Sequence, residues 1–165
     1  PDNQPNEAIM FPANFLALER IGCKVDASSK KKVLEELGKL FEGSAPGLTQ
    51  DAVFDRLLER ERLGSTGLGY GIALPHARVP DLEQAHGAFI QLSAGVDFDA
   101  IDNQPVDLVF ALLVPEVATQ EHLQLLAGLA TLFSQAAFCE RLRRARDRET
   151  LLKLLAAQEL AQVGA

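Results

Sequence analysis

The sequence predicts a single domain of the layered α/β class. Helical patterns occupy both ends of the chain and extended, strongly apolar segments lie between them, which is the order expected for a sheet packed against helices. The length of 165 residues suits one domain rather than two. An apolar fraction of 47% with 24% charged residues is typical of a chain that folds alone and is too hydrophobic for a disordered one.

The first part of the chain predicts two helices after a lead-in. Residues 1–13 are expected to be poorly ordered, and Phe15–Val25 has apolar positions too irregular to assign. A helix is predicted over Ser28–Phe41, because a serine can cap its start and apolar residues recur on one face. A second helix is predicted over Thr49–Leu63, with a capping hydroxyl at its start and arginines in its last turn.

The middle of the chain carries the expected strands. The loop Gly64–Gly71 has four glycines in eight residues and leads into a short strand over Ile72–His76, which Pro75 should end. Ala88–Leu92 is a second strand, and Val106–Val114 is almost continuously apolar, as in a central strand covered on both faces. Three helices with apolar residues at helical spacing then follow: Thr119–Phe133, Ser134–Arg144 and Glu149–Ala157.

Charge and composition exclude several function classes. Sixteen basic against 23 acidic residues give a net charge of -7 and a pI of about 5.0, which disfavours non-specific binding to nucleic acid. Cys23 and Cys139 lie outside any CxxC spacing, so neither a disulfide framework nor a thiolate zinc site is indicated. The N-terminus is polar, and no apolar run approaches the roughly 18 residues of a membrane span. We therefore expect a cytoplasmic protein that contacts neither nucleic acid nor a membrane interior.

Three rival functions are weaker on the sequence. Five arginines between Arg141 and Arg148 suggest RNA or DNA, but acidic residues interrupt them and favour a solvated, salt-bridged helix face. The acids between Asp97 and Asp107 suggest calcium, but Pro105 and the strand-like spacing favour a loop and hairpin. A zinc hydrolase has histidines and carboxylates available, but their spacing matches no HExxH or facial-triad pattern.

Two of the three histidines are candidates for one site. His76 follows Pro75 and is expected at the carboxyl end of its strand, and His122 lies in the first turn of a helix that Thr119 can cap. Ligands gather at the carboxyl ends of strands in open α/β sheets, so the two imidazoles share a pocket if the strands run parallel. His86, which follows an acidic loop, is expected to be a solvated turn residue.

The glycine-rich loop is expected at the same pocket. Its glycines permit close backbone approach, Ser65 and Thr66 offer hydroxyl donors, and Arg60 can clamp a phosphate from the preceding helix. The spacing is GxGxG, without the GxGxxG pattern or the Lys-Ser/Thr of a P-loop. The loop by itself is therefore also compatible with a structural turn.

Two longer segments resemble a known family. The segment Arg60–His76, RERLGSTGLGYGIALPH, is similar to the active-site segment of IIA domains of the fructose and mannitol class in the bacterial phosphotransferase system. The segment Phe98–Pro115, FDAIDNQPVDLVFALLVP, followed by His122 and Leu123, resembles the nitrogen-regulatory IIA branch in particular. The resemblance covers about residues 15–157, and its motifs are specific in combination.

The resemblance implies a mannitol-type IIA fold over residues 14–165, with a mixed parallel and antiparallel sheet flanked by helices on both faces. It also implies a phosphocarrier, in which His76 accepts a phosphoryl group from the phosphohistidine of an HPr-like protein. Near neutral pH an ordinary imidazole is mostly unprotonated, so its lone pair can attack phosphorus. His122 and Arg60 would line the site, and neither a cofactor nor a metal is implied. The phosphate-binding residues implied by the loop are Ser65, Thr66 and Gly67.

The resemblance leaves the downstream partner open. The nitrogen-regulatory branch implies that the phosphorylation state regulates target proteins. The alternatives are a sugar-specific IIA component that passes phosphate to a fructose- or mannitol-type IIB domain, and a pure protein-docking module. One departure from the family pattern is visible: Ala77 precedes Arg78 where the family commonly has Gly and then Lys or Arg.

Overall fold

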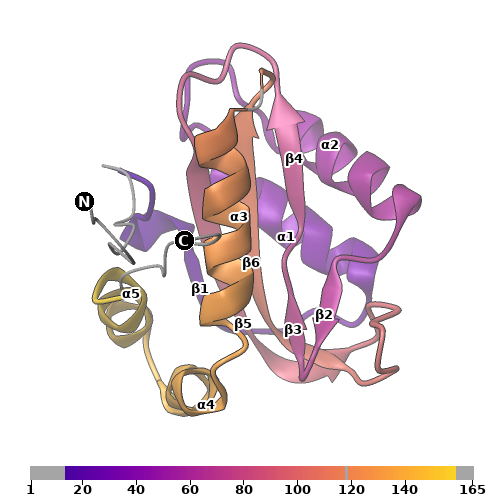
Figure 1. The fold of residues 1–165 in the computed structure, drawn as a ribbon, viewed down its shortest axis with the longest axis vertical. Coiled ribbons are helices and arrows are strands. Elements are labelled where there is room, and N and C mark those ends of the chain that lie inside the picture. The colour runs from indigo at the N-terminus through magenta and orange to yellow at the C-terminus, as the bar shows by residue number, and fades with distance from the viewer. Residues whose placement is uncertain (1–13, 118, 159–165) are drawn as a thin grey trace, which may run out of the picture.

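Strand β6 (Val106–Pro115) lies at the centre of a six-stranded mixed sheet in the computed structural model, which describes residues 14–117 and 119–158 (Figure 1). On one side β6 pairs antiparallel with β5 (His86–Val96). On its other side it pairs in parallel with β3 (Ile72–Ala73) and then β4 (His76–Val79). A central strand with neighbours of both directions confirms the predicted mixed sheet.

Two short strands complete the sheet edges. The strand β1 (Ile21–Val25) pairs in parallel with β5, and β2 (Gly67–Gly69) pairs antiparallel with β3. Strand β1 follows a single 3-10 turn, Leu18–Arg20, within the segment whose sequence was too irregular to assign. Its irregularity has a physical cause, because Lys24 has a positive φ of 52° and the pairing with β5 shifts register there.

Pro75 interrupts the strand that contains the candidate histidine but does not end it. Ile72 pairs with Leu108 and His76 pairs with Leu112, so the register against β6 is the same on both sides of the proline. The Pro75 carbonyl accepts a hydrogen bond of 2.9 Å from the Leu112 amide, which keeps this residue in the ladder although it has no N–H. The expectation that His76 lies at the carboxyl end of its strand is therefore wrong, since His76 opens β4.

Within the residues that the structure describes, five α-helices form two layers on opposite faces of the sheet, as predicted (Figure 1). Helices α1 (Lys30–Phe41) and α2 (Gln50–Leu63) cover one face, and α3 (Gln120–Leu132), α4 (Ala136–Arg144) and α5 (Arg148–Ala156) belong to the other. Alternate side chains of β6 supply the two cores, because successive residues of a strand point to opposite faces. The core under α3 to α5 receives Leu108, Phe110 and Leu112, and the core under α1 and α2 receives Val109, Ala111 and Leu113.

Side-chain caps fix the starts of most helices. The hydroxyls of Ser29, Thr49 and Thr119 accept bonds from backbone amides three residues later, as the sequence predicts for α1, α2 and α3. Helix α4 begins two residues later than expected, because the Ser134 hydroxyl bonds the Thr131 carbonyl at the end of α3. The predicted lead-in over residues 1–13 lies outside the described residues.

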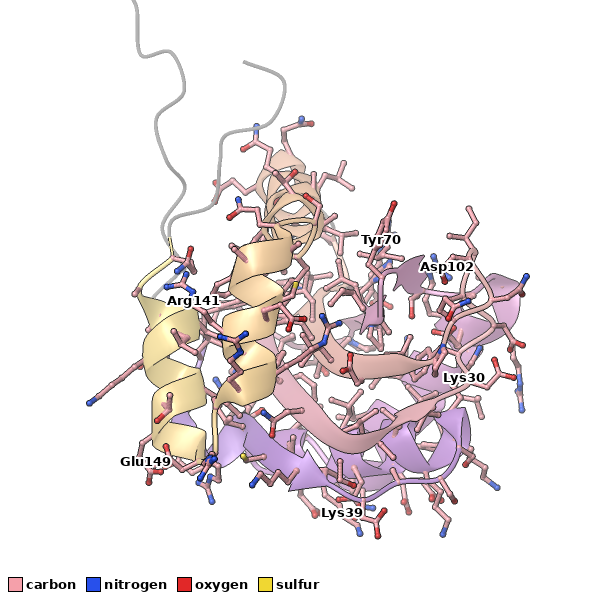
Figure 2. All side chains as sticks on the ribbon, turned by 90° about the horizontal axis from the view of Figure 1, so that it is seen from below. Lys30, Lys39, Tyr70, Asp102, Arg141 and Glu149 are labelled. Atoms are coloured by element: carbon pink, nitrogen blue, oxygen red, sulfur yellow. The ribbon has the colours of Figure 1, made fainter. Side chains whose placement is uncertain are left out.

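Residues 97–105 and Arg143 have the structural roles that the sequence favours for the two charged stretches. Residues 97–105 form the connection of the antiparallel pair β5 and β6. On α4, Arg143 makes a two-pronged ion pair with Asp107 and a second pair with Glu140, so it belongs to a salt-bridged face. Figure 2 shows α4 and α5 next to each other, with Arg141 and Glu149 labelled.

In the described part of the chain, no single helix combines the length and hydropathy needed to cross a bilayer. Helices α3 and α4 reach these values only as a pair, with a bend of 79° between them.

Candidate functional site

A cavity of about 560 Å³ opens where the last turns of α2, strand β4, the end of β6 and the first turns of α3 meet. Its walls combine leucine side chains with charged and titratable groups. The latter are Arg56, Glu59, Arg60, His76, Arg78, Glu116 and His122. The cavity thus contains the two predicted histidines and the predicted arginine, which come from three separate segments of the chain.

The imidazole of His76 is held by a hydrogen bond at one of its ring nitrogens. The ring is half-buried at the start of β4, and Nδ1 lies 2.9 Å from the Leu74 carbonyl oxygen. A carbonyl oxygen can only accept a hydrogen bond, so Nδ1 is the protonated nitrogen. No described residue hydrogen-bonds Nε2, which therefore retains its lone pair.

The environment keeps this imidazole neutral. Burial lowers the pKa of His76 below its ordinary value of 6.5, and the positive charge of Arg60 lowers it further. The hydrogen bond to the Leu74 carbonyl and the negative charge of Glu61 oppose this shift without reversing it. At neutral pH His76 is consequently an uncharged base with a free nitrogen.

His122 has the opposite arrangement in the first turn of α3. It forms a capping box with Thr119, whose hydroxyl accepts from the His122 amide while the Thr119 amide donates to Nδ1 at 3.2 Å. A nitrogen that accepts a hydrogen bond from an amide carries no proton, so the proton of the neutral ring is on Nε2. His122 therefore offers an N–H donor where His76 offers a lone pair.

Arg60 lies in the last turn of α2 and brings a positive charge to the cavity. Its Nη1 donates to the carbonyl of Gly64 at 2.9 Å, which ties the guanidinium to the chain just beyond the helix. Arg56, one turn earlier on the same helix, also lines the cavity. The two guanidiniums make this wall suitable for an anion.

The predicted phosphate loop lies outside the cavity lining. Ser65 donates to the Phe98 carbonyl at 2.6 Å and accepts from the Gly67 amide at 3.0 Å. Thr66 is buried and donates both its amide and its hydroxyl to Glu61. The structure brings together His76, His122 and Arg60, and it engages the polar groups of the loop in bonds that hold the loop itself.

Gly67 is required for packing at its position in β2. A Cβ there would lie 2.9 Å from the Ala100 Cβ and 3.0 Å from the Ala100 Cα. Real side chains do not approach this closely without a shift of the backbone, so the absence of a side chain lets the 97–105 connection pack against β2.

Glu61 is the residue of this region that sequence reasoning missed. It is buried at the end of α2 and accepts from Lys30 Nζ at 3.0 Å in addition to Thr66. The signal was present, because Val53, Leu57 and Glu61 recur every fourth residue on the buried face of α2. A carboxylate at a core position of a helix needs a partner, and here it has one cation and two donors.

His86 is not the solvated turn residue that the sequence suggested. It opens β5, pairs with Leu113 in the sheet and is only 7% exposed. Its Nδ1 has no hydrogen-bond partner among the described residues, and burial lowers its pKa, helped by the charge of Arg20. The expectation failed because strand pairing draws this residue into the sheet. His86 is not part of the cavity lining.

Ala77 and Arg78, where the sequence departs from the family pattern, both line the cavity. Ala77 is buried and pairs with Leu113 in β4, where the backbone is extended and accepts any residue. Arg78 is exposed on the other face of the strand. Within residues 14–117 and 119–158, no group of three or more His, Cys, Asp or Glu side chains is placed to hold a metal ion.

Comparisons with known proteins agree with this geometry. Residues 14–158 match the family described as "Phosphoenolpyruvate-dependent sugar phosphotransferase system, EIIA 2". A protein of Pseudomonas aeruginosa named nitrogen regulatory protein is 45% identical over 149 residues, which cover 90% of this chain and 93% of that protein.

Solved structures support the same assignment. The nitrogen regulatory protein IIA-Ntr of Neisseria meningitidis superposes with a TM-score of 0.81 at 45% identity, covering 86% of this chain and 96% of that one. IIA mannitol of Escherichia coli superposes with a TM-score of 0.71 at 27% identity, covering 86% and 99%. This similarity confirms the mannitol-type fold. The chain belongs to the EIIA 2 family of the phosphoenolpyruvate-dependent sugar phosphotransferase system and, within it, to the nitrogen-regulatory IIA proteins.

Proposed function

We propose that this protein is a cytoplasmic phosphocarrier of a nitrogen-regulatory phosphotransferase system, with His76 as the phosphoryl acceptor. The observation that carries the proposal is the 2.9 Å bond from His76 Nδ1 to the Leu74 carbonyl. It leaves Nε2 as the nucleophile in a cavity that also contains Arg60 and His122. The proposed donor is the phosphohistidine of an HPr-like protein.

The transfer exchanges one P–N bond for another. The lone pair of His76 Nε2 attacks phosphorus, and the electrons of the breaking P–N bond return to the ring nitrogen of the donor histidine. The His76 ring gains positive charge as the new bond forms, and Nδ1 keeps its proton. The Leu74 carbonyl stabilises that charge because it faces Nδ1–H.

In our proposal two residues stabilise the transferred group. Arg60 supplies a guanidinium that pairs well with phosphoryl oxygens, and His122 supplies an Nε2–H donor that bears no full charge. One preorganised donor of this kind lowers a barrier by about 3 kcal/mol. In this proposal Ser65, Thr66 and Gly67 build the loop that holds Arg60.

The rim of the cavity supports a protein as the partner. Leu63 and Leu123 line the cavity, yet they are 82% and 57% exposed. Large apolar side chains that remain exposed around charged groups are typical of protein-binding surfaces. The same face serves both the donor and the regulatory target proteins in our proposal, so phosphate on His76 changes the surface that a target meets.

The test is phosphorylation of the purified protein by enzyme I, an HPr-like carrier and phosphoenolpyruvate. We expect one acid-labile phosphate per chain, its loss in His76→Ala, and wild-type labelling in His86→Gln, the matched control at a buried histidine outside the cavity. Labelling that persists in His76→Ala contradicts the assignment.

The two alternatives give different results in extensions of this assay. Rapid loss of label to a fructose- or mannitol-type IIB domain would favour the sugar-specific route, for which the similarity to IIA mannitol is the reason to look. Equal binding of target proteins to the labelled and unlabelled forms would favour a pure docking module.

A further inference from the structure

Hydrogen bonds link the buried carboxylate of Glu61 to the backbone segments that hold His76 and Arg60. Its side chain is 3% exposed, and its two oxygens accept from the Thr66 hydroxyl at 2.6 Å and the Thr66 amide at 3.0 Å. Two bonds from one residue fix both the position and the orientation of Thr66. They do so five residues after Glu61, across the turn that ends α2.

One path leads from this anchor to the nucleophile. The Thr66 carbonyl accepts from the Leu74 amide at 3.0 Å, and the Leu74 carbonyl accepts from His76 Nδ1 at 2.9 Å. Each link therefore sets the place of the next acceptor or donor. The last acceptor decides which nitrogen of His76 carries the proton.

A second path leads to the cation. Gly64 and Ser65 lie between the fixed ends Glu61 and Thr66, and the Gly64 carbonyl holds Arg60 Nη1 at 2.9 Å. A short segment anchored at both ends keeps this carbonyl in place. The position of the guanidinium therefore depends on the same carboxylate.

We propose that Glu61 is a positioning residue of the phosphoryl-transfer site, which acts through Thr66 and Leu74 on the tautomer of His76 and through the Gly64 turn on Arg60. The effect of Glu61 on transfer rests on the proposed function, whereas its effect on the tautomer of His76 does not. Outer hydrogen-bond partners of metal ligands contribute about 10- to 100-fold to affinity or activity, and we take this range as the scale for a positioning residue here.

The alternative role of Glu61 is a purely structural ion pair. Lys30, labelled in Figure 2, bonds Glu61 at 3.0 Å and Asp99 at 3.1 Å, and it lies over the ring of Phe98. Asp99 thus shares the cation but has no bond to Thr66, and its carboxylate is 77% exposed. Asp99→Asn is therefore a matched control for Glu61→Gln, because both replace a carboxylate of the same cluster by its amide.

The experiment measures the His76 ring nitrogens by NMR, the pKa of His76, and the rate of phosphorylation by the HPr-like donor. In Glu61→Gln we expect part of His76 to change to the Nε2–H tautomer. The pKa of His76 should fall because a nearby negative charge is removed, and the rate should fall about tenfold. Asp99→Asn should match the wild type. The other charged or titratable groups near His76 are the same in all variants: Arg56, Glu59, Arg60, Arg78, Glu116 and His122.

A wild-type tautomer and pKa of His76 in folded Glu61→Gln would overturn the inference, and so would equal changes in Asp99→Asn. If Glu61→Gln does not fold, Thr66→Ser and Thr66→Val decide. The serine keeps the hydroxyl bond to Glu61 and should behave as the wild type, whereas the valine should show a smaller form of the Glu61→Gln change. An identical tautomer and pKa of His76 in Thr66→Ser and Thr66→Val would also overturn the inference. The tautomer is measured without a donor, so a wild-type protein that takes no phosphate refutes the proposed function alone.

Discussion

His76 and His122 both engage Nδ1 with the backbone, and they do so with opposite polarity. His76 Nδ1 donates to the Leu74 carbonyl, whereas His122 Nδ1 accepts from the Thr119 amide. The first ring is left with a lone pair on Nε2 and the second with a proton on Nε2. One cavity thus contains a ring nitrogen with a free lone pair and a ring N–H donor, which are the two groups that our proposal uses for transfer of an anionic phosphoryl group.

Removal of the His122 donor should slow phosphorylation without abolishing it. We expect His122→Ala to reduce the rate about 100-fold, because one preorganised donor is lost while the nucleophile remains. His122→Gln keeps an N–H donor and should recover part of the rate. The initial rate of labelling by the HPr-like donor measures both. A wild-type rate in His122→Ala would show that His122 serves only as a helix cap.

The guanidinium of Arg60 should not be replaceable by an ammonium group. Arg60→Ala should slow phosphorylation about 100-fold, and Arg60→Lys should recover little, because a lysine cannot bond Gly64 and the phosphoryl group with one rigid fork. Arg60 is partly exposed, so the free energy of unfolding should change by less than about 0.5 kcal/mol in both variants. Rates and urea unfolding curves give the two quantities. A wild-type rate in Arg60→Lys would show that the transfer does not need the two-pronged guanidinium.

Stability should fall in mild acid because of the histidines. The pKa values of His76 and His86 are lowered from 6.5 in the folded state, so the unfolded chain takes up protons first as the pH decreases. Their contribution is complete above pH 6.5 and is lost as the pH falls toward the folded-state values. In His76→Gln the dependence of the unfolding free energy on pH should be shallower over this window. Urea titrations at several pH values measure it, and an unchanged slope would contradict the shift at His76.

Gly67 should matter for stability and not for phosphate. Gly67→Ala introduces a Cβ against Ala100 and should lower the free energy of unfolding by about 1–3 kcal/mol. The labelling rate of the folded fraction should stay near the wild-type value. A stable variant with slow labelling would instead support the role at the phosphate that the sequence suggested for Gly67.

The elements that the sequence predicts well are those whose burial pattern is local. Helices α1, α2, α3 and α5 have a capping side chain at the start and apolar residues at helical spacing, and β6 is apolar because both of its faces are covered. The strands that the sequence did not predict depend on partners that are distant in the chain. Strand β1 forms because β5 pairs with it, and β4 forms because β6 extends past the position that lies next to Pro75.

The site shows the same division. His76, His122 and Arg60 were singled out by residue type, by their places near the ends of predicted elements and by the family resemblance, and the structure brings them into one cavity. The partners of Ser65 and Thr66 were missed because Phe98 lies 33 residues away from Ser65, and because Glu61 reads as one charge among several until the face of α2 is known. Hydrogen-bond partners of loop hydroxyls are a tertiary property, and the glycine pattern does not contain them.

The position of the phosphoryl group on His76, measured by NMR of the ¹⁵N-labelled phosphorylated protein, tests the proposed phosphocarrier function most directly. We predict phosphorus bonded to Nε2, with Nδ1 still protonated and facing the Leu74 carbonyl. Phosphorus on Nδ1, or on the ring of His122, would contradict this prediction.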